Sequence, residues 1–309
     1  MLSQLTRSRK TKNSNGKEHF HEEYQYLNLI NDIFEHGENI ESRNGTTKFI
    51  FGAAMHFSLE NNLIPILTTK KTAWKTCLKE LMWFIGGKTD NKVLKNDGVG
   101  IWNANATRTF LDERGLTHLD VDDLGPVYGH QWRHFNAKYT NCNEDYAGKG
   151  IDQLKYIIQH LKNPETRNSR RMIMTAWNPQ QLDEMALPPC HILAQFNVKN
   201  GNKLCCSLYQ RSGDVGLGVP FNIASYSFLT CLLAKHCDLE PYDFSYFLGN
   251  THIYDNHIEP LKEQVNREPL SFPTLRIERN YENIDDYKVE DFVVSDYKHH
   301  GVIKMDMST

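Results

Sequence analysis

One cysteine of the chain has neighbours that could make it a nucleophile. Cys190 ends a proline-rich turn at 187–190, and Arg211 follows it after two strand-like runs. A thiol attacks as the thiolate, and a free cysteine with a pKa of about 8.5 is only a few per cent ionised at neutral pH unless a nearby positive charge lowers that pKa. Arg211 is the candidate for this charge. The alternative is that Cys190 is a core residue, since free cysteines are usually buried.

Asn222 is a candidate for recognising a flat heterocyclic ring through hydrogen bonds. Its side-chain amide offers a donor and an acceptor, which is the pair needed to bind a uracil-like imide. Asn222 also precedes an apolar segment at 224–234, so its alternative role is the N-cap of a buried helix. The residue types leave both roles open.

Arginines at three places could bind an anion, because a guanidinium group matches phosphate with paired hydrogen bonds. They are Arg43, the adjacent Arg170 and Arg171, and Arg211 beside Ser212. Each of them alone is more typical of a surface ion pair. Their spacing therefore does not decide between the two roles.

Glu80 lies at the rim of the apolar face of an expected helix. It is either a surface carboxylate or a partly buried acid whose raised pKa suits it to proton transfer. Cys190, His191 and His252 are types that bind metals, but none of them stands in the paired spacing of zinc sites. We therefore expect no metal.

The composition is that of a soluble globular protein, with 309 residues, 39% hydrophobic residues and a net charge of −3. Because this net charge is negative, the molecule as a whole is not an electrostatic match for nucleic acid. The 7 cysteines have no repeated spacing, which favours a reducing compartment, and no apolar run is long enough to cross a membrane. We expect a cytoplasmic protein, with import into the nucleus or an organelle left open.

The expected elements mix helices and strands. Apolar residues at helical spacing predict a helix from Phe20 to a stop at Gly37, one capped by Thr72 that ends at Gly86, and further helices at 151–161 and 224–234. Strands are predicted at 47–59, 171–177, 192–198, 204–210, 242–251, 274–279 and 289–294, with a bulge or a close backbone approach at Gly52. These elements predict one α+β domain at residues 20–309, with helices packed on a mixed or mostly antiparallel sheet.

Residues 1–19 differ from the rest of the chain. They carry basic side chains among Ser, Thr and Asn, with almost no apolar residue to bury. Such a segment is typical of a flexible arm. A basic arm could also contact RNA weakly.

Five motifs of this chain resemble those of the thymidylate synthase family, in the family's order. They are DLGPVYG at 123–129, LPPCH at 187–191, QRSGD at 210–214, GVPFNIASY at 218–226 and THIY at 251–254. The resemblance runs from about residue 20 to the C-terminus. The segments DYAGKG at 145–150 and IKMDM at 303–307 resemble the eukaryotic branch in particular.

The resemblance implies a methyltransferase that converts dUMP to dTMP, with 5,10-methylenetetrahydrofolate as the donor of the carbon and the hydride, and dihydrofolate as the second product. The catalytic residues it implies are Cys190 as nucleophile, Glu80 and Tyr128 for proton transfer, Asn222 at the imide, and Arg211. The substrate residues it implies are Arg43, Arg170, Arg171, Gln210, Arg211, Ser212, Asn222, His252 and Tyr254. The folate residues it implies are Ile101, Trp102, Asp214, Leu217, Gly218, Phe221 and Met307.

The resemblance also implies a homodimer formed through the sheet, in which Arg170 and Arg171 reach the partner's site. Two other functions stay as alternatives. One is a pyrimidine nucleotide hydroxymethylase, which shares the thiol addition but ends with water in place of hydride; Asn222 argues against its cytidylate form, for which an acidic residue is expected. The other is a non-catalytic homologue that binds RNA through the basic arm.

Overall fold

A six-stranded sheet forms the centre of the protein in the computed structural model, which describes residues 11–12, 18–19, 21–42 and 45–307. The strand order is β3-β4-β8-β7-β6-β5. The strands are β3 (Glu38–Ser42), β4 (Gly45–Ser58), β5 (Ile173–Thr175), β6 (His191–Lys199), β7 (Lys203–Asp214) and β8 (Glu240–Tyr254). Only β7 and β8 pair in parallel; the other neighbouring strands are antiparallel. The predicted mixed sheet is confirmed.

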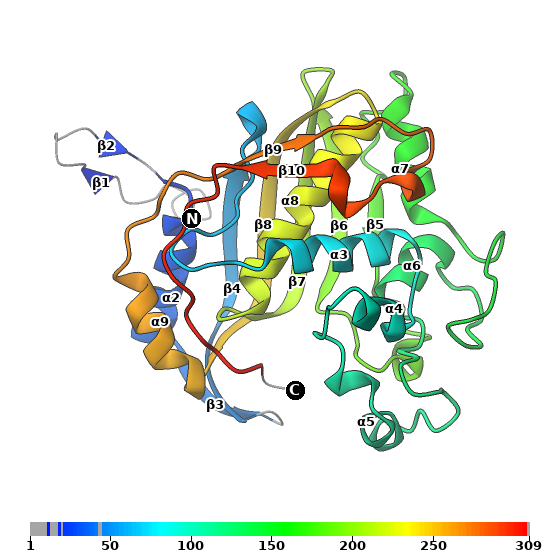
Figure 1. Ribbon diagram of the computed structural model, residues 1–309, viewed down its shortest axis with the longest axis horizontal. Coiled ribbons are helices and arrows are strands. Elements are labelled where there is room, and N and C mark those ends of the chain that lie inside the picture. Colours follow the sequence, from blue (N-terminus) through cyan, green and yellow to red (C-terminus); the bar gives the residue numbers. More distant parts are fainter. Residues whose placement is uncertain (1–10, 13–17, 20, 43–44, 308–309) are drawn as a thin grey trace.

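One face of this sheet is covered by helices. The helix α8 (Gly218–His236) is apolar on nearly all sides and packs on β7 and β8, with α3 (Trp74–Ile85) against it. Figure 1 shows α3 and α8 together in front of the sheet. The other helices of the described residues are α2 (Tyr24–His36), α4 (Asn91–Asn96), α5 (Arg108–Glu113), α6 (Tyr128–His134), α7 (Gln153–Lys162) and α9 (Ile258–Val265). The predicted α+β domain is therefore confirmed for the described part of the chain.

The predicted cap at Thr72 is wrong, and the alternative role of Asn222 as an N-cap is not observed. The helix α8 begins at Gly218 with Leu217 as its N-cap, so Asn222 lies inside the helix. Pro220 does not delay this start, because the first N–H groups of a helix have no intrahelical partner and proline loses nothing there. Thr72 does not cap α3 either; the N-cap is Ala73, and the Thr72 N–H donates to the Tyr297 hydroxyl over 2.8 Å.

The prediction at Gly52 is also wrong. The pairing of β4 with β8 keeps one register on both sides of Gly52, so there is no bulge. A Cβ added at this position would meet nothing within 4 Å among the described residues, so no backbone approaches it closely. The glycine is explained by its φ of +90°, a conformation that other residues rarely adopt.

A smaller pair of antiparallel strands, β9 (Thr274–Ile277) and β10 (Phe292–Ser295), crosses above α8. The strand predicted at 289–294 is shorter than expected because residues 289–291 form a 3₁₀ turn. Other 3₁₀ turns lie at Glu60–Asn62, Ala104–Ala106, Leu182–Glu184, Asp255–His257 and Ile284–Asp286.

The N-terminal arm lies mostly outside the described residues. Of residues 1–19, the structure describes β1 (Thr11–Lys12) and β2 (Glu18–His19), which pair antiparallel. Among the described residues, no helix combines the length and the apolar character needed to cross a membrane.

Candidate active site

A cavity of about 490 Å³ brings most of the predicted site residues together. It lies where the first turn of α8 meets the ends of β7 and β8. Its lining holds Glu80, Ile101, Trp102, Tyr128, Cys190, Gln210, Arg211, Ser212, Asp214, Leu217, Gly218, Phe221, Asn222, His252, Tyr254 and Met307. Residues far apart in the sequence are thus gathered at one site, together with Asn105, Leu187 and His191, which were not predicted to be there.

Three predicted arginines do not belong to this group. Arg43 lies outside the described residues. Arg170 and Arg171 are exposed just before β5 and do not line the cavity. Arg211 is therefore the arginine that the described residues of a single chain bring to the cavity.

Cys190 is held at the cavity wall by its backbone. Its N–H donates to the Tyr128 hydroxyl over 2.7 Å, and its carbonyl accepts from the Arg211 N–H over 2.9 Å. The register of β6 against β7 shifts between His191 and Leu193, directly after Cys190. Such an irregularity redirects side chains next to a strand end, and here it lets Cys190 line the cavity.

The Arg211 guanidinium is fixed beside the thiol. Its Nε donates to the Pro189 carbonyl over 2.8 Å and its Nη2 to the Pro188 carbonyl over 2.9 Å, which leaves Nη2 4.0 Å from Cys190 Sγ. Burial raises the pKa of the Cys190 thiol, and the Arg211 charge acts against that by lowering it. The expected cation is therefore present, but in a single chain burial outweighs it.

Glu80 is the acid that spacing alone left undecided. Burial raises its pKa to about 7, although a hydrogen bond from Trp102 Nε1 to Glu80 Oε1 over 2.8 Å acts in the opposite direction. A carboxyl group with a pKa near the working pH can both give and take a proton. Of its two predicted environments, the structure has the partly buried one.

Asn222 is oriented by a chain of hydrogen bonds. Its Nδ2 donates to Gln210 Oε1 over 2.7 Å, and the Tyr246 hydroxyl donates to the same oxygen over 2.6 Å. Gln210 Nε2 donates to the Ser212 carbonyl over 2.8 Å, which fixes which end of Gln210 is the acceptor. The amide of Asn222 is thereby fixed as well, with one N–H used and its carbonyl oxygen available to the cavity.

His191 supports Tyr128, a role that the sequence did not reveal. The two rings stack with centroids 4.1 Å apart, and His191 Nδ1 lies 2.8 Å from the Tyr226 hydroxyl. Burial lowers the pKa of His191 to about 3, so the ring is neutral. Its place next to Cys190 was the only signal in the sequence.

The sugar and folate candidates stand around the rest of the cavity. His252 is buried, with Nδ1 2.9 Å from Asn250 Oδ1, and its ring meets the Tyr254 ring edge-on at 5.2 Å. Asp214 is half-buried, and its Oδ1 accepts from the Gly216 N–H over 2.9 Å. The cavity lining places this carboxylate together with the apolar side chains of Trp102 and Phe221.

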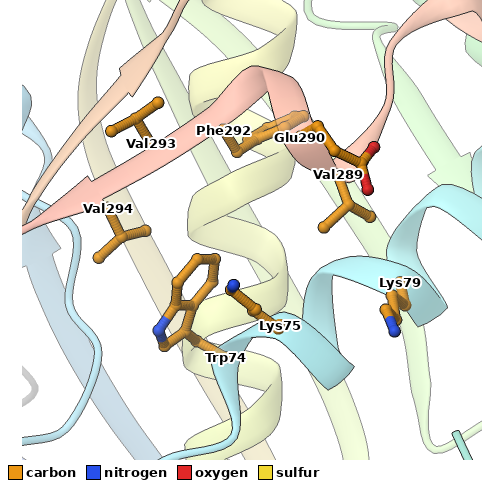
Figure 2. Close-up of a pocket in the computed structure, with 8 residues that line it drawn as sticks. All are labelled: Trp74, Lys75, Lys79, Val289, Glu290, Phe292, Val293 and Val294. Atoms are coloured by element: carbon orange, nitrogen blue, oxygen red, sulfur yellow. The ribbon is translucent and has the colours of Figure 1, made fainter. Parts of the chain in front are cut away.

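A second cavity, of about 520 Å³, lies between α3 and residues 289–294 (Figure 2). Its lysines are engaged within the chain: Lys75 Nζ lies 5.6 Å from the Trp74 ring centroid, and Lys79 Nζ donates to the Asp97 carbonyl over 2.6 Å. Neither a cysteine nor a serine is among its lining residues. The chemistry therefore favours the first cavity, although the second is slightly larger.

A search of the described part of the chain finds no group of three or more His, Cys, Asp and Glu side chains placed to hold a metal ion. The fold and the cavity together define a class of enzyme, one that attacks its substrate with a cysteine beside an arginine and moves protons with a carboxyl group of near-neutral pKa.

Comparison with known proteins identifies the family. The family model described as thymidylate synthase matches residues 24–309. The thymidylate synthase of Homo sapiens is 53% identical over 93% of this chain and 91% of its own length, and that of Equine herpesvirus 2 is 52% identical over 93% and 99%. The chain belongs to the thymidylate synthase family, as its motifs predicted.

Some similar proteins are much longer than this chain. The bifunctional dihydrofolate reductase-thymidylate synthase of Plasmodium chabaudi is 51% identical over 96% of this chain but only 52% of its own length. The chain thus spans about half the length of the bifunctional relatives it matches.

Proposed function

We propose that the protein converts dUMP to dTMP, with 5,10-methylenetetrahydrofolate as the donor of both the methylene carbon and a hydride, and releases dihydrofolate. The observation that carries this proposal is the single cavity in which Cys190, Arg211, Asn222 and Glu80 meet. Membership of the thymidylate synthase family supports it. No metal or nicotinamide is needed, because the folate is also the reductant.

Cys190 starts the reaction. Its thiolate forms a bond to C6 of the uracil, and the electron pair of the C5–C6 double bond moves towards C5 and O4, which makes C5 a nucleophile. After C5 has bonded to the methylene carbon and lost its proton, the bond from that carbon to the folate nitrogen breaks. Hydride from the tetrahydrofolate so released then adds to this carbon as the Cys190–C6 bond breaks, which gives the methyl group, dihydrofolate and the free thiolate. The position of Arg211 Nη2, 4.0 Å from the sulfur, supports stabilisation of the thiolate.

Asn222 selects the base in this proposal. Because one of its N–H groups is held by Gln210, its carbonyl oxygen and its second N–H remain for the ring. These match the N3–H donor and the O4 acceptor of uracil, whereas cytosine presents an acceptor and a donor at the same places. The orientation of the amide therefore favours dUMP over dCMP.

Glu80 and Tyr128 handle protons. Glu80, with a pKa of about 7, can give a proton towards O4 through water and take it back later. Tyr128 accepts from the Cys190 N–H, which leaves its own hydroxyl proton directed elsewhere in the cavity. Its place beside the nucleophile supports a part in removing the C5 proton.

The residues present also fit the folate. Its flat pterin ring needs apolar walls and an acceptor for its N–H groups, and Trp102, Phe221 and the Asp214 carboxylate provide them. When bound, the folate supplies the carbon and the hydride. The part of the chain's own residues is to orient it against the nucleotide and to exclude water.

The test is an assay of the purified protein with dUMP and methylenetetrahydrofolate. We expect dihydrofolate absorbance to rise in step with dTMP formation. A product heavier by a hydroxymethyl group would instead indicate the hydroxymethylase alternative, and no product at all would refute both. No observation on the described residues favours the RNA-binding alternative.

We expect Asn222→Asp to reverse the choice of base. The carboxyl group can be protonated to donate to N3 of cytosine and accept from its amino group, while it repels the uracil carbonyl. kcat/KM for dUMP should fall by about 10³-fold or more, because a buried polar group left unpaired is costly, and activity on dCMP should appear. Steady-state kinetics with both nucleotides measures this; Asn200→Asp, in an exposed turn, is the matched control and should change neither value.

We propose further that the protein is a homodimer formed through the uncovered face of the sheet. A row of side chains crosses this face in register, from Ala54 to Phe247, Tyr209 and Leu193. None of them is buried, and Phe247 and Tyr209 are 41% and 39% exposed. Exposed apolar surface of this kind is typical of an interface.

The dimer also completes the site in this proposal. In one chain Arg211 does not offset the burial of the Cys190 thiol, and a phosphate dianion needs several charge-assisted bonds. Arg170 and Arg171 are exposed next to β5, the edge of the same sheet. We infer that they reach the partner's cavity.

We expect Phe247→Lys to give monomers with little activity. Sedimentation measures the association, and the rate of alkylation of the Cys190 thiol should fall in the monomer because two cations are lost. Val93→Lys, on α4 and 40% exposed, is the control and should leave both unchanged. A Phe247→Lys monomer with full activity would contradict the shared site.

A further inference from the structure

A buried histidine links the cavity to the C-terminal segment. His257, in the turn after β8, has a fully buried side chain. Its Nε2 lies 2.7 Å from the carbonyl oxygen of Asp306, and its Nδ1 lies 3.5 Å from Asp214 Oδ1. The two nitrogens of the ring thus face two different groups. One is the Asp214 carboxylate, a folate candidate in the cavity lining, and the other is the main chain of residues 305–307, here called the tail.

Both of these oxygens are acceptors only. A neutral imidazole has a single N–H and can satisfy one of them, whereas the imidazolium form donates to both. Nδ1 is buried and makes no hydrogen bond among the described residues, so the Asp214 oxygen at 3.5 Å is an ion-pair contact. A neutral ring with its proton on Nε2 would turn the lone pair of Nδ1 towards this carboxylate, whereas the imidazolium places an N–H there, so the arrangement favours a proton on each nitrogen.

The groups around the His257 ring favour its protonated, imidazolium form. Burial lowers the pKa of His257, but Asp214 and the Asp306 carbonyl outweigh it, so that the pKa is raised above 6.5; Lys70 acts against them. His252 and the ring of Tyr254, 5.6 Å away, are the other groups facing His257 from β8. Lys70 is engaged with the Gly216 carbonyl.

Gly216 lies between His257 and the tail. A Cβ at this position would collide with His257 Nδ1 and would stand 3.1 Å from Met305 Sδ. The backbone can therefore pass between the ring and the tail only as glycine. The tail beyond it packs Met305 against the core and places Met307 in the cavity lining.

We propose that His257 is a positioning residue: as the imidazolium it ties the Asp214 carboxylate to the main chain at Asp306 and so holds residues 305–307 over the folate end of the cavity. This inference rests on the proposed function for the identity of the ligand. Its consequence is that binding of folate and seating of the tail are coupled, and that both weaken as pH rises through the pKa of His257.

The first test needs no ligand. NMR of the full chain, with labelled methionine methyl groups and histidine rings, follows Met305, Met307 and His257 during a pH titration. We expect the two methyl signals to change with the same midpoint as the His257 ring. His257→Gln, which keeps one donor but cannot carry charge, should give the high-pH signals at every pH, whereas His118→Gln, at an exposed histidine, should give those of the unaltered protein.

The second test is kinetic. In His257→Gln the KM for methylenetetrahydrofolate should rise by about tenfold, the usual effect of losing a charge-assisted hydrogen bond, while the KM for dUMP changes less than about twofold. A loss that is equal for both substrates would indicate general damage to the fold and would overturn the proposal.

The two proposals fail in different ways. If the unaltered protein makes no dTMP, the proposed function is wrong, and the NMR titration still decides whether His257 holds the tail. If dTMP is made but the signals of Met305 and Met307 do not follow His257, the positioning role is wrong.

Discussion

Cys190→Ser abolishes turnover and leaves nucleotide binding almost unchanged. A serine hydroxyl is ionised far less than a thiol and is a weaker nucleophile, so kcat should fall by at least about 10⁴-fold. The Kd for dUMP should change by less than about threefold, because Arg211, Gln210 and Asn222 keep their hydrogen bonds to one another and to the backbone. Single-turnover kinetics and calorimetry measure the two quantities separately.

The matched control is another partly accessible cysteine. Cys142 lies outside the cavity and is half-buried, with its N–H held by Asp123 Oδ2 over 2.9 Å. Cys142→Ser should retain activity within about twofold. Turnover by the Cys190 variant at even a hundredth of the normal rate would remove Cys190 from the role of nucleophile.

The fold was largely predictable because its elements carry strong local patterns. The helix α8 is apolar all round and the strands β6 and β7 alternate buried and open positions, so both follow from periodicity. The departures lie at element ends, except for the one at Gly52 inside β4. Asn222 is a good N-cap type, yet the helix begins earlier, since packing of its first turn on the sheet overrides the local preference.

The site was predictable as a set of residues but not as a set of contacts. The motifs named Asn222 and Gln210 separately; their hydrogen bond depends on β7 and α8 meeting in space. The same holds for Glu80, whose environment stayed open until Trp102 was found beside it. The His191 ring, on β6, stacks on the Tyr128 ring, on α6, and no pattern in the sequence links these two segments. Local sequence does not encode such long-range pairs.

Glu80→Gln is the substitution that best tests proton transfer. Glutamine has the same shape and its Oε1 can still accept from Trp102 Nε1, so the change removes the acid and little else. We expect kcat to fall by about 10²- to 10⁴-fold, the usual contribution of a general acid or base. Glu113→Gln, on the exposed surface of α5, is the control and should be fully active.

The pH dependence gives this prediction its sign. Burial raises the pKa of Glu80 from 4.5 to about 7, so the protonated form that first donates towards O4 is lost as pH rises above about 7, and kcat at saturating folate should fall there. Glu80→Gln should lack this fall.

Between pH 4.5 and about 7 the folded protein holds the Glu80 proton more tightly than the unfolded chain does. The free energy of unfolding therefore decreases with rising pH in this range, and this decrease should also vanish in Glu80→Gln. Trp102→Phe removes the hydrogen bond that lowers the Glu80 pKa, and it should move both transitions to higher pH; a shift to lower pH would refute the assignment.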